Sequence, residues 1–261
     1  MPINRRQILA GLSAGAAGSM LVALSRAAVA RGTSSAVVPQ PPSPQTSLPA
    51  LSRQLQAVPR RRQFTTLPRL LDHPDLWDDV AFEALRAYRS EERMIGTGTS
   101  LSGNWPVEAQ NLLNSEIFSF GHPEALLVMA LWSEAQLALY DDEAWSRYGL
   151  SRLTSSGQSV PPLRQVATGY SRHHQDEQGV YGAAGRSIPA LQARGVVFLA
   201  CHNAVWAHAG RLLALGAVAG NPGQGQLAAT LTNHLDPRAI VTPSALGALA
   251  ELQRAGFSRV F

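Results

Sequence analysis

Two uninterrupted apolar runs constrain the fold of this 261-residue chain more than any other feature. Residues 125–131 and 195–200 have the pattern of strands that are covered on both faces. Helical patterns surround them at residues 76–89, from 104 onward, and at 203–219, 226–234 and 245–255, while 239–241 and 257–261 predict two further strands. Strands that alternate with helices predict an α/β domain with a mostly parallel sheet and helices on both faces, a three-layer sandwich.

Capping residues mark several of the predicted helix ends. Asn104 is a plausible N-cap with proline in the first turn that follows, and Ser244 is placed to cap the helix over 245–255. The acidic residues 141–143 also resemble a helix start, because carboxylates favour the positive end of the helix dipole. Residues 221–223, Asn-Pro-Gly, stop one helix and Gly256 ends another.

The basic charge of the chain is confined to its N-terminal part. All 22 basic residues are arginine, against 18 acidic residues, and nine arginines but no acid lie within residues 1–71. Residues 72–261 therefore carry a net charge of −5, which argues against nucleic acid as a partner. The absence of lysine excludes a Schiff-base lysine and a P-loop lysine. A single cysteine excludes an intramolecular disulfide and a zinc site built from several thiolates.

The first 30 residues resemble a twin-arginine translocation signal. Arg5 and Arg6 precede a weakly apolar stretch diluted by glycine, and residues 28–30 have the small-x-small form of a cleavage site that ends at Ala30. The resemblance implies the twin-arginine (Tat) translocase as a partner, a periplasmic location and no stable membrane span after cleavage. The alternative, a transmembrane anchor, needs about 20 predominantly apolar residues and is disfavoured by these glycines.

Residues 31–71 are rich in proline and arginine and predict a disordered linker. Five prolines fall within residues 39–49, and such a segment buries too little apolar surface to offset its conformational entropy. The predicted domain organisation is therefore a signal peptide over 1–30, a linker over 31–71 and a folded domain over 72–261.

Cys201 is the principal candidate for chemistry. It follows the predicted strand at 195–200 and precedes the predicted helix at 203–219, a place where the positive end of a helix dipole favours a thiolate. His202 is adjacent and could assist. The alternative is that Cys201 is an ordinary core residue, since cysteine is among the most buried residue types.

Several motifs together resemble the DsrE/DsrF-like family of sulfur-relay proteins, in particular its exported branch with twin-arginine leaders. They are carried by residues 111–114, 139–150, 191–204, 240–245 and 252–257, in an order and spacing that cover roughly residues 80–261. An insertion between Thr154 and Arg186 has no counterpart in the pattern.

The resemblance implies a DsrE-like sandwich, a homo-oligomer, and a persulfide carried by Cys201 at the position of the family's cysteine. It also places Asp142 near the mouth of the sheet, so Asp142, Trp145 and Asn203 are candidate binding residues. Sulfane sulfur transfers by attack of thiolate on sulfur, for which a low-pKa thiol is suited. The sulfur donor and acceptor cannot be deduced, and a sulfurtransferase-like activity stays open beside a carrier role.

Two other hypotheses compete with the sulfur carrier. One is a non-enzymatic periplasmic binding or assembly module with Cys201 in its core, and the other is a sulfur oxidoreductase with a bound metal or haem. No ligand constellation supports the second, because residues 173–177 read as a solvated loop more than as a metal site. Residues 96–100 are glycine-rich but lack the pattern of a dinucleotide fold. We therefore expect no metal and no cofactor.

Overall fold

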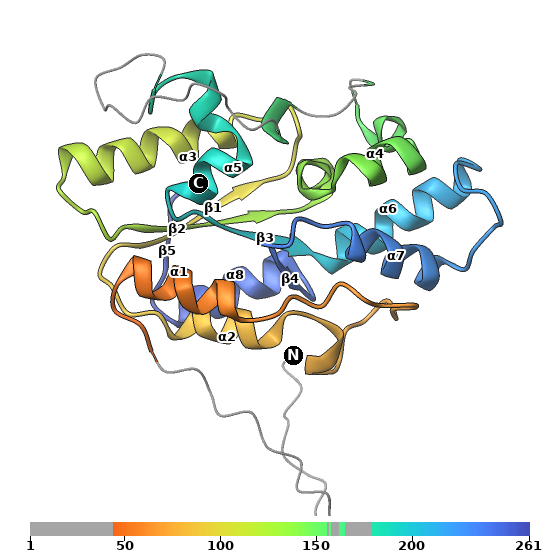
Figure 1. Cartoon of the computed structure of the whole chain (residues 1–261), viewed down its shortest axis with the longest axis horizontal. Helices are drawn as coiled ribbons and strands as arrows, with labels where there is room; N and C mark the ends of the chain where they lie inside the picture. The colour runs from red at the N-terminus through yellow and green to blue at the C-terminus, as the bar shows by residue number, and fades with distance from the viewer. Residues whose placement is uncertain (1–43, 156, 158–161, 165–178) are drawn as a thin grey trace, which may run out of the picture. The chain divides into compact units, whose positions relative to one another are not determined.

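The computed structural model describes residues 44–155, 157, 162–164 and 179–261, which all fall within the compact unit Gln40–Phe261. They form three layers, with a parallel β-sheet between two layers of helices (Figure 1). The α/β class and the sandwich predicted from the sequence are confirmed.

The sheet has five strands in the order β4-β3-β2-β1-β5, and every pairing is parallel. The two apolar runs of the sequence form the central strands β2 and β3, whose pairing aligns Val128 with Val197. The strands are β1 (Arg93–Gly98), β2 (Leu126–Leu131), β3 (Val197–Cys201), β4 (Ile240–Thr242) and β5 (Ser258–Arg259).

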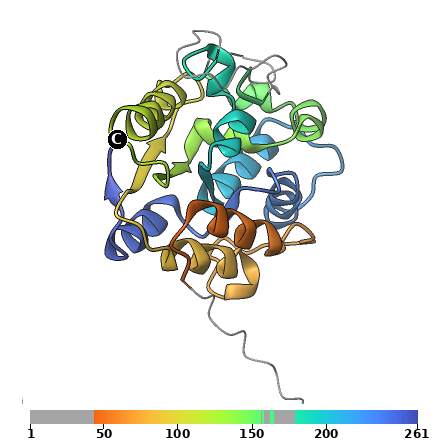
Figure 2. The same ribbon diagram turned by 60° about the vertical axis from the view of Figure 1, so that its left-hand side comes forward.

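Helices cover both faces of the sheet, as Figure 1 and the turned view in Figure 2 show. One face carries α3 (Trp105–Asn114), α4 (Asp142–Tyr148), α5 (Ile188–Ala193), α6 (His202–Ala214) and α7 (Gln224–Asn233). The opposite face carries α1 (Leu48–Ala57), α2 (Asp79–Ala87) and α8 (Ala245–Arg254).

Alternation along the strands divides the apolar core in two. Leu127, Met129 and Leu131 of β2 belong to the cluster under α3 to α7, whereas the intervening side chains of β2 belong to the cluster under α1, α2 and α8. Every residue of β2 is buried. This explains the uninterrupted apolar run, because a strand that is covered on both faces has no solvent side.

The capping predictions hold in most places. The Ser244 hydroxyl accepts a hydrogen bond from the Gly247 N–H, and α8 ends before Gly256, which has φ +93°. Asn104 occupies the N-cap position of α3, but its side chain makes no capping bond. Helix α6 ends at Ala214, earlier than predicted, because Gly216 adopts φ +59° and breaks the helix.

Strand β1 lies where the sequence indicated only a glycine-rich segment. Both glycines of β1 are required by packing: a Cβ atom on Gly96 would lie 2.5 Å from the Phe261 ring, and one on Gly98 would lie 2.8 Å from Trp105. Glycine is uncommon in strands, but it allows a ring to lie directly against the backbone.

The prediction of a disordered linker over residues 31–71 is wrong for its described part, residues 44–71. Helix α1 packs against α2, and Leu51 and Leu55 are buried in the core beneath it. Leu67 and Leu71 are buried in a small cluster with Ala229 of α7. The linker prediction rested on the proline-rich composition and overlooked leucines at helical spacing. These leucines bury the apolar surface that a disordered segment was expected to lack.

The segment after α1 protects the outer edge of the sheet. Asp78 is buried; its carboxylate accepts hydrogen bonds from the backbone N–H groups of Val241 in β4 (2.7 Å) and Arg61 (2.8 Å) and from the Arg62 guanidinium (3.0 Å). The Asp78 N–H donates to the Val241 carbonyl. The backbone groups of Val241 that face away from β3 are thus satisfied, and this edge cannot pair with another strand.

Candidate functional site

Cys201 ends β3 and is the N-cap residue of α6, as the sequence predicted. Its side chain points toward α8 rather than along α6: Sγ accepts a hydrogen bond at 3.3 Å from the backbone N–H of Ala245, the first residue of α8. Negative charge on Sγ would therefore face the first turn of a ten-residue helix, where free N–H groups and the dipole stabilise an anion.

The backbone beside the thiol is held by a buried amide. Gln136 has no exposed surface, and its Oε1 accepts the Cys201 N–H at 2.6 Å. Gln136 belongs to a 3-10 helix, Ser133–Leu139, which follows β2 directly. Gln136 thus connects the segment after β2 to the end of β3, and the bond from Ala245 to Sγ connects the end of β3 to α8.

A cavity of about 320 Å³ opens over Cys201 at the carboxyl edge of the sheet. This is the edge at which open parallel sheets bind ligands, since loops and helix N-termini meet there. Cys201 is only 5% exposed, and it is one of the residues that line the cavity. Three parts of the chain provide the walls: Trp132, Ser133 and Glu134 after β2; Asn203, Ala204, Ala207, His208 and Arg211 of α6; and Ser244, Ala245 and Leu246 at α8.

His208 lies in the wall of this cavity in its neutral form. Its Nε2–H donates to the Ser133 carbonyl at 3.1 Å, and the Tyr140 hydroxyl donates to Nδ1 at 3.3 Å. Burial lowers the pKa of His208 to about 4, because the charged ring would lose its hydration, and the positive charge of Arg211 acts in the same direction. Both ring nitrogens are thus engaged, and His208 positions the backbone at Ser133 instead of exchanging protons with Cys201.

Ser133 has an uncommon backbone conformation, with φ +53°. A residue with a side chain is strained in the left-handed region and stays there only where its surroundings hold it. Here the His208 bond to the Ser133 carbonyl provides that constraint. Such residues concentrate at functional sites, which supports the assignment of this cavity as the candidate site.

Charged groups of both signs lie at the cavity mouth. Arg211 and Asn203 are exposed, so the Arg211 guanidinium can meet a ligand as it enters. The Glu134 carboxylate already accepts bonds from the backbone N–H and the hydroxyl of Ser155. Arg211 is therefore the cationic group of this cavity with which an anionic ligand could pair.

Of the residues that the sequence singled out, the structure brings only Cys201 and Asn203 together in this cavity. His202 is fully buried and does not line the cavity; its Nε2–H donates to the Pro68 carbonyl at 2.9 Å, and burial lowers its pKa. Asp142 is exposed and pairs with Arg164 at 3.1 Å. Trp145 is buried, and its indole N–H donates to the Leu137 carbonyl at 3.0 Å. These three have structural contacts instead.

The residues that sequence reasoning missed follow predicted strands. Ser133 lies two residues after β2, and Ala245 lies three residues after β4. Extending the strand-end argument from Cys201 to these strands would have identified both. The candidate signal residues Arg5, Arg6 and Ala30, the paired histidines at 173–174 and most of the insertion lie outside the described residues.

Within the part of the chain that the structure describes, no three His, Cys, Asp or Glu side chains cluster closely enough to hold a metal ion. In the same ranges, no helix has the length and apolar character needed to cross a bilayer. No protein-family model matches the chain, and searches of curated proteins and of solved structures find no significant match.

Proposed function

We propose that this protein carries sulfane sulfur as a persulfide on Cys201. The observation that supports the proposal is the position of Cys201, which lines a cavity and whose Sγ lies 3.3 Å from the first backbone nitrogen of α8. A thiolate held there is both an attacking group and a leaving group for sulfur transfer.

The transfer step needs no outside oxidant. The Cys201 thiolate attacks the outer sulfur of a donor persulfide R–S–SH, a new S–S bond forms between Sγ and that sulfur, and the donor's own S–S bond breaks. The products are the Cys201 persulfide and the thiolate RS⁻, so charge and protons balance. Arg211 at the cavity mouth suits an anionic donor, and the reverse reaction delivers the sulfur to an acceptor thiolate.

The proposal includes the DsrE-like family assignment, export through the twin-arginine pathway, a periplasmic location and assembly as a homo-oligomer. Fractionation of cells that express the full chain, with Arg5 and Arg6 both changed to Gln as the comparison, tests the export. Light scattering of the purified protein measures its oligomeric state.

Alkylation and mass spectrometry test the sulfur chemistry. We expect the purified protein to react with iodoacetamide at neutral pH and to gain one sulfur atom after polysulfide treatment. Cys201→Ser should lose both reactions. Ala207→Trp, which places an exposed side chain in the cavity, should slow both without disturbing the core.

A second function is favoured by the burial of Cys201, which is 5% exposed and belongs to the apolar cluster under α8. In this alternative the protein is a non-enzymatic periplasmic binding or assembly module, and Cys201 is a core residue. If the native protein is alkylated only when it is unfolded, and if polysulfide adds no sulfur, the carrier function is wrong and this alternative holds.

A further inference from the structure

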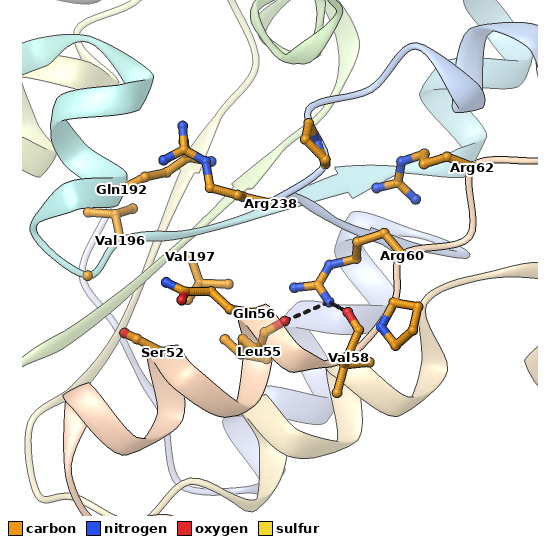
Figure 3. Close-up of a pocket in the computed structure, with 13 residues that line it drawn as sticks. Ser52, Leu55, Gln56, Val58, Arg60, Arg62, Gln192, Val196, Val197 and Arg238 are labelled. Atoms are coloured by element: carbon orange, nitrogen blue, oxygen red, sulfur yellow. Dashed lines mark hydrogen bonds between the residues drawn. The ribbon is translucent and has the colours of Figure 1, made fainter.

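A second and larger cavity lies at the other end of β3. It has a volume of about 440 Å³ and is bounded by the C-terminal half of α1 and the first residues of β3 (Figure 3). Strand β4 pairs with β3 only from Leu199 onward, so Val197 at the start of β3 has no strand on that side. The space that a longer β4 would occupy is open.

The walls of this cavity combine apolar surface with arginine side chains. Leu55, Val58 and Val197 contribute aliphatic groups. Figure 3 shows the guanidinium groups of Arg60 and Arg238 on the sides of the cavity, contributed by the segment after α1 and the loop before β4. The apolar part of an amphipathic ligand could pack on these aliphatic groups, and its charged part could pair with a guanidinium group.

Arg60 forms no ion pair with a carboxylate within the described residues, although Asp78 and Asp236 act on its charge from farther away. Its Nη1 donates to the carbonyls of Leu55 (3.1 Å) and Val58 (2.8 Å), and its Nε donates to that of Ala239 (3.3 Å). The carboxylate of Asp78 is occupied by Arg62. Burial of the guanidinium, ahead of the charges around it, lowers the pKa of Arg60. A half-buried guanidinium whose hydrogen bonds all go to carbonyls can still form an ion pair with an anion that enters the cavity.

Arg238 adds a second available guanidinium. Its side chain is 51% exposed, and its contact with Asp236 is a long one, at 3.8 Å between Nε and Oδ1. Arginine forks bind carboxylates and phosphates through paired N–H groups, so the Arg238 guanidinium can turn toward a ligand at little cost.

We propose that this cavity binds an organic anion with an apolar body, such as a medium-chain carboxylate, with Arg60 and Arg238 contacting its charged head. The aliphatic chain would lie against Leu55, Val58 and Val197. This site is separate from the Cys201 cavity, since about 13 Å of strand separates Val197 from Cys201 at the usual rise per residue. It does not depend on the proposed sulfur chemistry.

Calorimetric titration of the full chain with octanoate tests the site, with octan-1-ol as the neutral probe and inorganic phosphate as the bare anion. We expect octanoate to bind one site per chain and more tightly than either of the other two. Arg238→Gln and Arg60→Gln should each weaken octanoate binding by about tenfold, the loss of a charge-assisted hydrogen bond. Arg53→Gln is the matched control, because Arg53 is exposed on α1 and does not line the cavity.

Three results would each overturn the proposal. The first is octanoate binding no tighter than octan-1-ol or phosphate. The second is an unchanged octanoate affinity in Arg238→Gln, and the third is an equal loss of affinity in Arg53→Gln. Arg60→Gln can disturb the end of α1 because Arg60 bonds to two carbonyls there, so Arg238→Gln decides the matter on its own, since the Arg238 side chain makes no hydrogen bond to the backbone in the described structure.

Discussion

Acidification should destabilise the fold through His208, in an amount that follows from the burial of its ring. The pKa of His208 is about 4 in the folded protein, against 6.5 for a free histidine. The unfolded chain therefore takes up a proton below pH 6.5 that the folded chain refuses until about pH 4. The stability that His208 contributes is complete above pH 6.5 and is lost as the pH falls toward 4.

The size of this loss can be worked out from the two pKa values. At ~1.4 kcal/mol for each pH unit between them, the whole effect is about 3 kcal/mol. Of this, about 2.5 kcal/mol would be lost on going from neutral pH to about pH 4.5. Domains are typically stable by about 5–15 kcal/mol, so one histidine would account for a sizeable part of the acid sensitivity.

Urea unfolding of the native protein and of His208→Gln, at several pH values between about 7.5 and 4.5, measures the effect. Glutamine retains an N–H that can reach the Ser133 carbonyl but cannot take up a proton, and contributions from all other groups cancel in the difference. The free energy of unfolding of the native protein should fall by about 2.5 kcal/mol more than that of the variant. His73→Gln, at an exposed ring, is the control for removing a histidine and should stay within about 0.5 kcal/mol of the native protein.

Parallel pH curves for the native protein and His208→Gln would refute the reasoning, because they would mean that the buried ring takes up its proton as easily as a free one. An NMR titration of the His208 ring protons gives the same answer independently. Its midpoint should lie near pH 4.

Two further predictions concern the segment after residue 44. Leu51→Ala should cost about 2–5 kcal/mol in urea unfolding, since Leu51 is fully buried beneath α1, whereas Arg53→Ala on the exposed face should change the free energy of unfolding by less than about 0.5 kcal/mol. A truly disordered linker would give the same small change for both. Asp78→Asn should lower the free energy of unfolding by about 3–5 kcal/mol, because it leaves the buried end of Arg62 without its ion pair, while Asp75→Asn at the surface should change it little. If the two variants unfolded at similar urea concentrations, Asp78 would not have the proposed role of protecting the outer edge of the sheet.

The layers of this fold could be predicted from the sequence because its central strands are buried on both faces and carry unmistakable apolar runs. Strand β1 could not, since Gly96 and Gly98 are unfavourable in an isolated strand and become favourable only when Phe261 and Trp105 pack on them. These contacts join residues that are far apart in the chain, so a local sequence pattern cannot predict them. Helix α1 was missed because its polar residues, and the prolines of the stretch in which it begins, obscured two leucines one helical turn apart.

The part of the candidate site that could be predicted is the part that lies where a strand ends and a helix begins. Cys201 lies at a helix N-terminus as expected, but the helix that its thiol faces is α8, which begins 44 residues later, and not α6. His202 was expected to assist because it is adjacent in sequence, yet it turns to the Pro68 carbonyl, in a segment expected to be disordered. Neighbours in sequence at a strand-to-helix junction point in different directions, so adjacency is a poor guide to shared chemistry.

The position of β5 has a consequence for the order of events during synthesis. Strand β5 pairs with β1, and the Phe261 ring fills the space above Gly96, so the outer side of β1 stays open while more than 160 residues are being made. At 5–20 residues per second, this is a wait of roughly 10–30 seconds in which an unpaired strand edge is exposed. Without β5, this edge of β1 would have no strand beside it. The order of the elements along the chain therefore leaves the protection of this edge to one of the last segments to be made.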